Sequence, residues 1–416
     1  MTTTDNTPPT AAGLDAAGRR RVLTVLCATQ ITSWGVLYYA FPVLSTSITA
    51  DTGWSAQAIT AAFSLGQLAA ALTGIPVGRI LDRVGPRTVM TAGSALAAPA
   101  VAVVALAPNL AVFYLGWLLA GLAMGAVLYP PAFAALTRWH GEQRVRALMI
   151  LTLVAGLAST VFAPLTAAVD TRTDWRVTYL LLAAVLAAIT IPAHWLGLRG
   201  HWPDSPPMAV GSGFDRHDRV ARSRSFLALT VALALGAFTA FAGVFNLVPL
   251  MLEHDFTPGL AALTLGLGGA GQVLGRLGYL QVTARTGPGT RLIAVLAGTS
   301  AATALLGLAD TVIALIVISI GAGLVRGVTT LVQATAITDR WGPAHYGSLN
   351  GLLNAPIVIV MALAPWAGTA LTAATGSYAN TYLVLAAVAA LAALIGAAAT
   401  PTLRTTPESV ATEGHR

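Results

Sequence analysis

The chain has 416 residues, of which 56% are hydrophobic and only 9% are charged. A soluble domain carries about 25% charged residues, so this composition excludes an ordinary soluble protein and indicates repeated membrane spans. All 23 basic residues are arginine, the formal net charge is +7, and the single cysteine, Cys27, has no partner for an intramolecular disulfide.

Twelve apolar segments follow one another along the chain, each close to or above the roughly 20 residues that cross a bilayer as a helix. They occupy residues 22–48, 55–78, 87–107, 110–137, 145–169, 175–198, 226–252, 259–283, 290–309, 311–338, 346–374 and 378–399. We therefore predict an all-α polytopic membrane protein with twelve transmembrane helices in two six-helix halves. The predicted parts are a tail (1–21), a bundle (22–198), a central loop (199–225), a second bundle (226–399) and a tail (400–416).

The arginines divide unevenly between the two sides of these spans. All but four lie in the two tails, the central loop and the other loops on that same side; Arg172 and Arg176 lie on the other side, and Arg276 and Arg326 fall within spans. Because cytoplasmic loops carry the excess of Lys and Arg, we expect both termini in the cytoplasm and the protein in the plasma membrane. This distribution accounts for most of the net charge without a nucleic-acid partner.

The segment "GRILDRVGPR", between the second and third spans, resembles the signature of the major facilitator superfamily. The matching residues are Gly78, Asp82, Arg83, Gly85 and Arg87. A glycine at 78 would let a neighbouring helix approach closely, and one at 85 would allow a turn with permissive backbone angles. The resemblance implies that Asp82 joins an ion-pair network that holds one conformation shut, a conformational latch.

Further segments resemble the monocarboxylate and oxalate–formate branch of that superfamily. They are "YAFPV" with "GWS", "RWHGEQRVRALMILTLVAG" and "DWRVTYL". The resemblance implies a transporter that moves a small organic anion by alternating access. The chain departs from that branch at two positions: Val43 replaces a lysine, and Gln272 replaces a carboxylate one turn before the arginine of the eighth span. The absence of this charged pair argues against proton–lactate symport. A cavity made positive by two arginines, which the substrate neutralises, would favour exchange of one anion for another or movement of the anion together with a proton.

Arg276 aligns with the arginine that contacts the substrate carboxylate in that branch. It comes about 26 Å after the start of its span at Gly259, whereas Arg79 comes about 36 Å after Ser55, at 1.5 Å per residue. Arg276 therefore lies deeper in the membrane than Arg79. We expect it to contact substrate; the alternative is a structural arginine that extends its head group to the membrane surface.

Arg326 lies at a similar depth in the tenth span, among glycines that would admit a ligand or a closely packed helix. The alternative is a salt bridge or carbonyl contact within the second half. Polar side chains that could complete a site by hydrogen-bonding a carboxylate are Tyr38, Tyr39, Tyr129, Gln272, Gln333 and Asn354. We predict no enzyme activity, no cofactor and no metal site, because no nucleotide-binding loop, ligand cluster or nucleophile–base pair occurs.

The leading interpretation is a secondary transporter of a small organic anion, a carboxylate, that functions as a monomer in the lipid bilayer. One alternative is an efflux carrier for a drug-like or secondary metabolite, which would need a wide apolar cavity. Another is a membrane sensor that binds a ligand without transporting it.

Overall fold

The computed structural model describes residues 14–202, 220–341 and 346–399. Within these ranges, twelve helical segments are long and apolar enough to cross a membrane, which confirms the predicted all-helical fold. The first half contains α1 (Ala16–Trp34), η1 (Gly35–Tyr39), α2 (Ala40–Thr52), α3 (Ala56–Ala105), α4 (Leu110–Val127), α5 (Tyr129–His140), η2 (Gly141–Gln143), α6 (Arg144–Gly156), α7 (Ala158–Asp170) and α8 (Trp175–Gly197). The second half contains α10 (Arg224–Glu253), α11 (Pro258–Leu277), α12 (Tyr279–Arg285), α13 (Pro288–Leu308), α14 (Val312–Thr335), α15 (Thr338–Trp341), α16 (Tyr346–Thr375) and α17 (Tyr378–Ala397).

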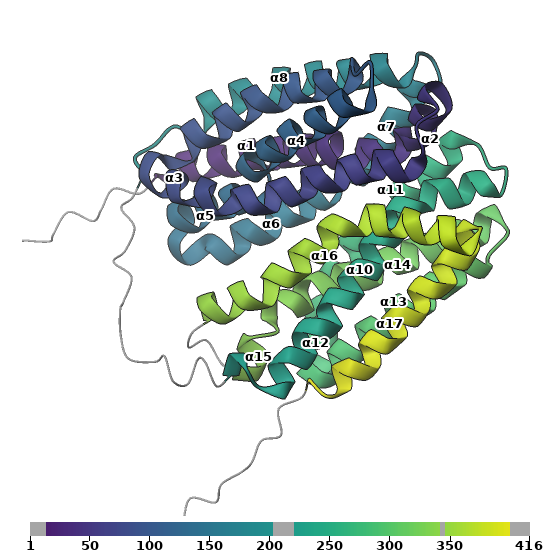
Figure 1. Cartoon of the computed structure of the whole chain (residues 1–416). Coiled ribbons are helices and arrows are strands. Elements are labelled where there is room, and N and C mark those ends of the chain that lie inside the picture. The colour runs from purple at the N-terminus through teal and green to yellow at the C-terminus, as the bar shows by residue number, and fades with distance from the viewer. Residues whose placement is uncertain (1–13, 203–219, 342–345, 400–416) are drawn as a thin grey trace, which may run out of the picture.

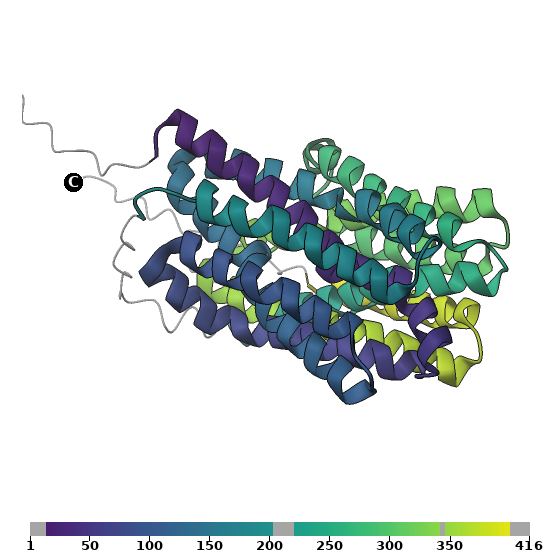
Figure 2. The ribbon, with the colours of Figure 1, turned by 90° about the horizontal axis from the view of Figure 1, so that it is seen from above.

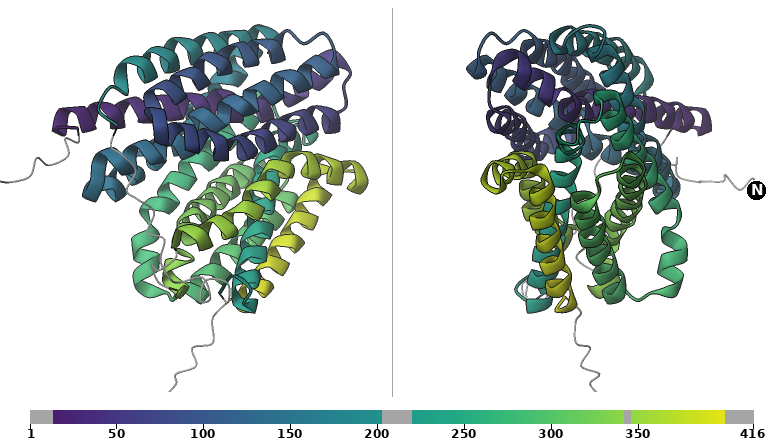
Figure 3. Two further views of the ribbon diagram at one scale, coloured as in Figure 1. Left: turned by 60° about the vertical axis from the view of Figure 1, so that its left-hand side comes forward. Right: turned by 90° about the vertical axis from the view of Figure 1, so that its right-hand side faces the viewer.

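The two halves form two helical bundles that lie side by side (Figures 1 and 2). They meet near α2, α7 and α11 and diverge toward the end that carries α5, α12 and α15 (Figures 1 and 3). We call the diverging end the arginine-rich end. Most of the described arginines lie there, at the start of α1, around the turn within α3 and near the ends of α5, α12 and α15. The other end is called the opposite end.

Contacts between the halves run from the middle of the molecule to the opposite end. Phe245 of α10 packs against Phe63 of α3 and Tyr38 of η1, with ring centroids 4.9 and 5.1 Å away. The Thr160 hydroxyl donates to the Gly266 carbonyl at 2.9 Å, and the Trp366 amide donates to the Ser64 hydroxyl at 3.2 Å. The opposite end is therefore held together by buried aromatic packing, which is worth more than its area alone.

Several predicted spans are interrupted. The predicted span 110–137 divides into α4 and α5 at Leu128, whose backbone is extended (φ −82°, ψ −160°). The predicted span 145–169 divides into α6 and α7 at Leu157. By contrast, the second and third spans run together as α3 and are separated only by Gly85, at φ 80° and ψ 167°. A positive φ of this kind is freely open only to glycine, so this turn depends on that residue.

The first helix is continuous across the membrane but contains a π-helical turn, Gly35–Tyr39. A Cβ at Gly35 would overlap with the ring of Phe162 on α7, so only glycine permits this approach. A π turn inserts an extra residue and rotates the side chains that follow, and such turns are frequent at functional sites. It places Tyr38 and Tyr39 at the middle of the molecule.

Candidate functional site

The site begins with the contact between α11 and α14, which is made through glycines. A Cβ at Gly275 would overlap with the carbonyl oxygen of Leu324, and one at Gly327 would overlap with that of Gln272. Small residues let helix backbones touch in membrane proteins. This contact places Gln272 and Arg326 side by side, although they come from different helices.

Arg276 lies on the same helix, one turn beyond Gln272, and reaches into the first half. Its Nη1 donates to the backbone carbonyl of Thr152 on α6. A Cβ at Gly156 would come within 3.1 Å of this guanidinium, so the glycine at the end of α6 leaves room for it. The Tyr129 hydroxyl at the start of α5 lies within electrostatic range of the Arg276 guanidinium. Arg276 therefore links the two halves.

Arg326 contacts the predicted polar partner beside it. Its Nη2 donates to Gln272 Oε1 at 3.3 Å, and Tyr38 lies within electrostatic range of its guanidinium. The salt bridges among the described residues include neither Arg276 nor Arg326. Both arginines are permanent cations, so in the described part of the chain their charge is balanced by carbonyl, amide and hydroxyl dipoles alone.

Aromatic rings cover the first-half side of the two arginines. Tyr38 packs edge-on against Tyr39 at 5.2 Å and against Trp34 at 5.3 Å, and Trp34 packs against Tyr129 at 5.0 Å. Sequence reasoning identified the three tyrosines but did not include Trp34, or Phe245 on α10. The signal for Trp34 was available, since it lies one helical turn before Tyr38 and shares its face.

The buried polar atoms at this site are mostly donors without acceptors. In the described part of the chain, Tyr38 Oη, Trp34 Nε1, Arg276 Nε and Arg326 Nε have no hydrogen-bond partner. A buried donor without a partner costs about 1–3 kcal/mol. Donors and positive charge gathered in this way suit a ligand that brings hydrogen-bond acceptors and negative charge.

The predicted residues Gln333 and Asn354 lie elsewhere. Gln333 Nε2 donates to Asn354 Oδ1 at 2.7 Å, which joins α14 to α16. Gln333 is two turns from Arg326 toward the arginine-rich end, about 10 Å along the helix axis. The structure therefore pairs these two residues with each other.

The predicted latch segment lies at the arginine-rich end and contacts its own half. Asp82 Oδ1 pairs with Arg138 Nη2 at 2.5 Å, and Arg138 stacks on the ring of Trp202 at 4.5 Å. Arg87 donates to the backbone carbonyl of Trp195 at 2.9 Å, and its guanidinium stacks on the ring of the same residue.

Arg83 of this segment is exposed. The two glycines of the segment, Gly78 and Gly85, differ in how closely other atoms approach them. A Cβ at Gly85 would meet the ring of Trp202 at 3.3 Å. At Gly78, however, the expected close helix approach is absent, because a Cβ there would meet no atom within 4 Å. The reason is the divergence of the two bundles at this end (Figure 1).

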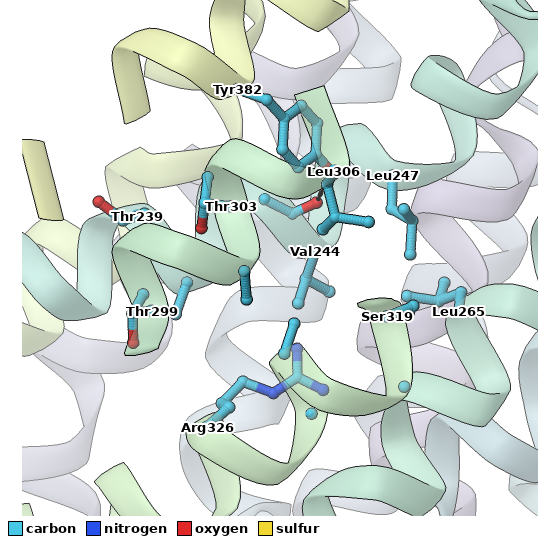
Figure 4. A pocket seen from close by; sticks show the side chains of 16 residues that line it. Thr239, Val244, Leu247, Leu265, Thr299, Thr303, Leu306, Ser319, Arg326 and Tyr382 are labelled. Carbon is cyan, nitrogen blue, oxygen red and sulfur yellow. Dashed lines mark hydrogen bonds between the residues drawn. The ribbon is translucent and has the colours of Figure 1, made fainter. Parts of the chain in front are cut away.

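A larger and a smaller cavity lie between the helices. One, of about 270 Å³, lies between the halves toward the opposite end, where Phe41, Phe245, Thr49 and Thr369 are among its lining residues. The other, of about 50 Å³, lies inside the second half and is lined by Arg326 (Figure 4).

Residues 26–335 match the family model of the Major Facilitator Superfamily. The chain belongs to this superfamily. It is accordingly a multi-pass membrane transporter and not an enzyme.

Curated relatives include monocarboxylate transporters. Monocarboxylate transporter 13 of Rattus norvegicus is 27% identical over 339 residues, which are 78% of this chain and 76% of that protein. Monocarboxylate transporter 11 of Homo sapiens is 31% identical over 236 residues, or 55% of this chain and 47% of that protein. The predicted resemblance to the monocarboxylate branch is thereby confirmed.

Solved structures share the fold of this chain at low identity. A bacterial homologue of the human lysosomal transporter Spinster, inward-facing and unoccupied, superposes with a TM-score of 0.75 at 14% identity, over 93% of this chain and 98% of that one. The nucleoside transporter NupG gives 0.72 at 14% identity, over 92% and 98% of the two chains. These structures support the twelve-helix fold.

Proposed function

We propose that this transporter moves a small organic anion, a carboxylate, by alternating access. The observation that carries the proposal is Arg276, a permanent cation at the interface between the halves without an acidic partner in the described part of the chain. A charge buried in a membrane protein is costly and marks a substrate or ion pathway. The curated monocarboxylate relatives support the same substrate class.

The carboxylate would bind between Arg276 and the aromatic side of the first half. A planar guanidinium can give two parallel N–H groups to two carboxylate oxygens, and Arg276 Nε has no partner in the described structure. Tyr129 faces this guanidinium from the first half, so its hydroxyl can donate to the same carboxylate. Gln272 lies one turn before Arg276 on α11 and would receive a second polar group of the substrate.

Alternating access would break and re-form the hydrogen bond between Arg276 and the Thr152 carbonyl, because the two residues belong to different halves. We place both termini in the cytoplasm of a plasma-membrane protein, since the arginine-rich end then faces inward. The bundles diverge at that end (Figure 3), and the opposite end is closed by the contacts of Phe245. The described conformation is then inward-facing, with the exterior path closed.

The latch proposal concerns the loop of Asp82. Its ion pair with Arg138 holds α3 to α5 within the first half, while Arg87 holds the same turn to the end of α8. These contacts would make the first half move as one body. Asp82 is 54% exposed, so it remains accessible to a partner when the two halves approach at this end.

Coupling is proposed to be anion exchange. Gln272 is neutral and occupies the position one turn before Arg276, and Val43 is buried in an apolar cluster of α2, α7, α10 and α11. Neither can carry a proton. An unloaded site would favour return only after a second anion binds, because the empty site leaves the charge of Arg276 without a counter-ion.

Reconstituted vesicles test the proposal. Purified protein in liposomes is preloaded with an unlabelled monocarboxylate, and uptake of the same labelled compound is followed. We expect stimulated uptake for the parent and for Arg285→Gln, which removes an exposed arginine from α12, and little for Arg276→Gln. An efflux carrier for neutral or cationic compounds would show no such uptake, and a non-transporting sensor would bind the anion without moving it; either result contradicts the proposal.

A further inference from the structure

The small cavity inside the second half is separate from the interface between the halves. Its walls come from α10, α11, α13 and α14, with Tyr382 of α17 at one side. Figure 4 shows Arg326 extending from α14 toward the space bounded by Val244, Thr303 and Ser319. All the residues that line this cavity belong to the second half.

Arg326 is the charged residue among those that line the cavity, and no Asp or Glu lies among them. A guanidinium has five N–H donors. One of them is used for Gln272, and Nε is buried without a partner in the described part of the chain. Since arginine stays protonated, this wall carries a full positive charge whose remaining donors are free.

Of the threonine and serine hydroxyls that line the cavity, one remains available as a hydrogen-bond donor. Thr239, Thr299 and Ser319 donate to the carbonyls of Leu385, Val295 and Thr264, at 3.2, 2.8 and 3.1 Å. Thr303 is 7% exposed, and its hydroxyl has no acceptor among the hydrogen bonds of the described residues. Arg326 and Thr303 therefore offer donors to an occupant that only accepts hydrogen bonds.

The size of the cavity selects the occupant. An engineered cavity of about 150 Å³ takes a benzene molecule, and a water needs about 10–15 Å³. At about 50 Å³, this cavity has room for one ion and an accompanying water but little for an organic carboxylate. We propose that it binds a small inorganic anion, a halide such as chloride, as a resident counter-ion of Arg326. This site is distinct from the proposed carboxylate site at Arg276, and its occupant is not the transported anion.

The test measures thermal unfolding of the purified full chain at constant ionic strength while sodium chloride replaces sodium methanesulfonate, whose anion is too large for the cavity. Ligand binding to the folded state raises the unfolding temperature, and we expect a shift on the order of 2 °C at 0.15 M chloride. Bromide should act like chloride. Arg326→Gln should abolish the shift, and Thr303→Val should reduce it.

Two control variants separate this inference from the proposed function. Arg276→Gln should keep the full chloride shift while losing carboxylate binding. Thr329→Val removes a hydroxyl of α14 that donates to the Val325 carbonyl outside the cavity, and it should also keep the shift. An absent chloride shift in the parent, or an undiminished one in Thr303→Val or Arg326→Gln, would overturn the inference. If Arg326→Gln does not fold, Thr303→Val and its control decide the result.

Discussion

Replacing Arg276 is the most direct perturbation of the proposed carboxylate site. Arg276→Gln removes the charge but keeps an amide that can still donate to the Thr152 carbonyl. Arg276→Lys keeps the charge but loses the paired N–H groups. Because the parent guanidinium already has one partner across the interface, a bound carboxylate adds to that contact and does not have to replace it.

The expected loss follows from the bonds that the substrate would form. A hydrogen bond to a charged group contributes about 1.5–3 kcal/mol, and 1.4 kcal/mol corresponds to a tenfold change in affinity. Arg276→Gln should therefore weaken carboxylate binding by about ten- to a hundredfold. Arg276→Lys should lose less, because it still attracts the anion. Without ligand, the glutamine variant should unfold at the parental temperature or above it, since it no longer buries a charge.

The assay is ligand-induced thermal stabilisation of purified parent, Arg276→Lys, Arg276→Gln and Arg285→Gln proteins against a series of monocarboxylates. Arg285 lies exposed on α12, so its substitution controls for the loss of one positive charge. The reasoning is refuted if Arg276→Gln responds to the best monocarboxylate as strongly as the parent does. Arg276 would then be structural, and its bond to Thr152 would serve only to join the halves.

Three further predictions concern the latch, the coupling and the helix contact. Asp82→Asn removes the ion pair with Arg138 and should lower vesicle transport while monocarboxylate binding in detergent persists; parental transport rates would disprove the latch. An imposed pH gradient should drive accumulation weakly, whereas preloading with anion should stimulate uptake; strong gradient-driven uptake that a protonophore abolishes, unaffected by preloading, would reject exchange. Gly275→Ala should destabilise the fold by about 1–3 kcal/mol through overpacking against α14, measured by unfolding. Gly321→Ala, whose Cβ would meet no atom within 4 Å, should be nearly neutral; equal effects of the two alanine variants would contradict the helix-contact argument.

The twelve spans could be predicted from the sequence because membrane insertion is a local property. A window of about 20 apolar residues crosses the bilayer whatever its neighbours are. The same reasoning identified Arg276 and Arg326, since a charge inside such a window stands out without any knowledge of packing. It also placed Gly85 at a turn, because only the backbone of that one residue is involved.

Which side chains meet depends on the rotation of each helix about its own axis and on how closely two helices approach, and neither is local. The π turn at Gly35–Tyr39 rotates Tyr38 toward the centre, and the glycine contact of α11 with α14 brings Gln272 to Arg326. Arg276 reaches Thr152, which is 124 residues away in the sequence, only because α6 ends beside α11. For the same reason Gln333 pairs with Asn354. The predicted spans alone would allow several other partners, and the packing of α14 against α16 determines which one is used.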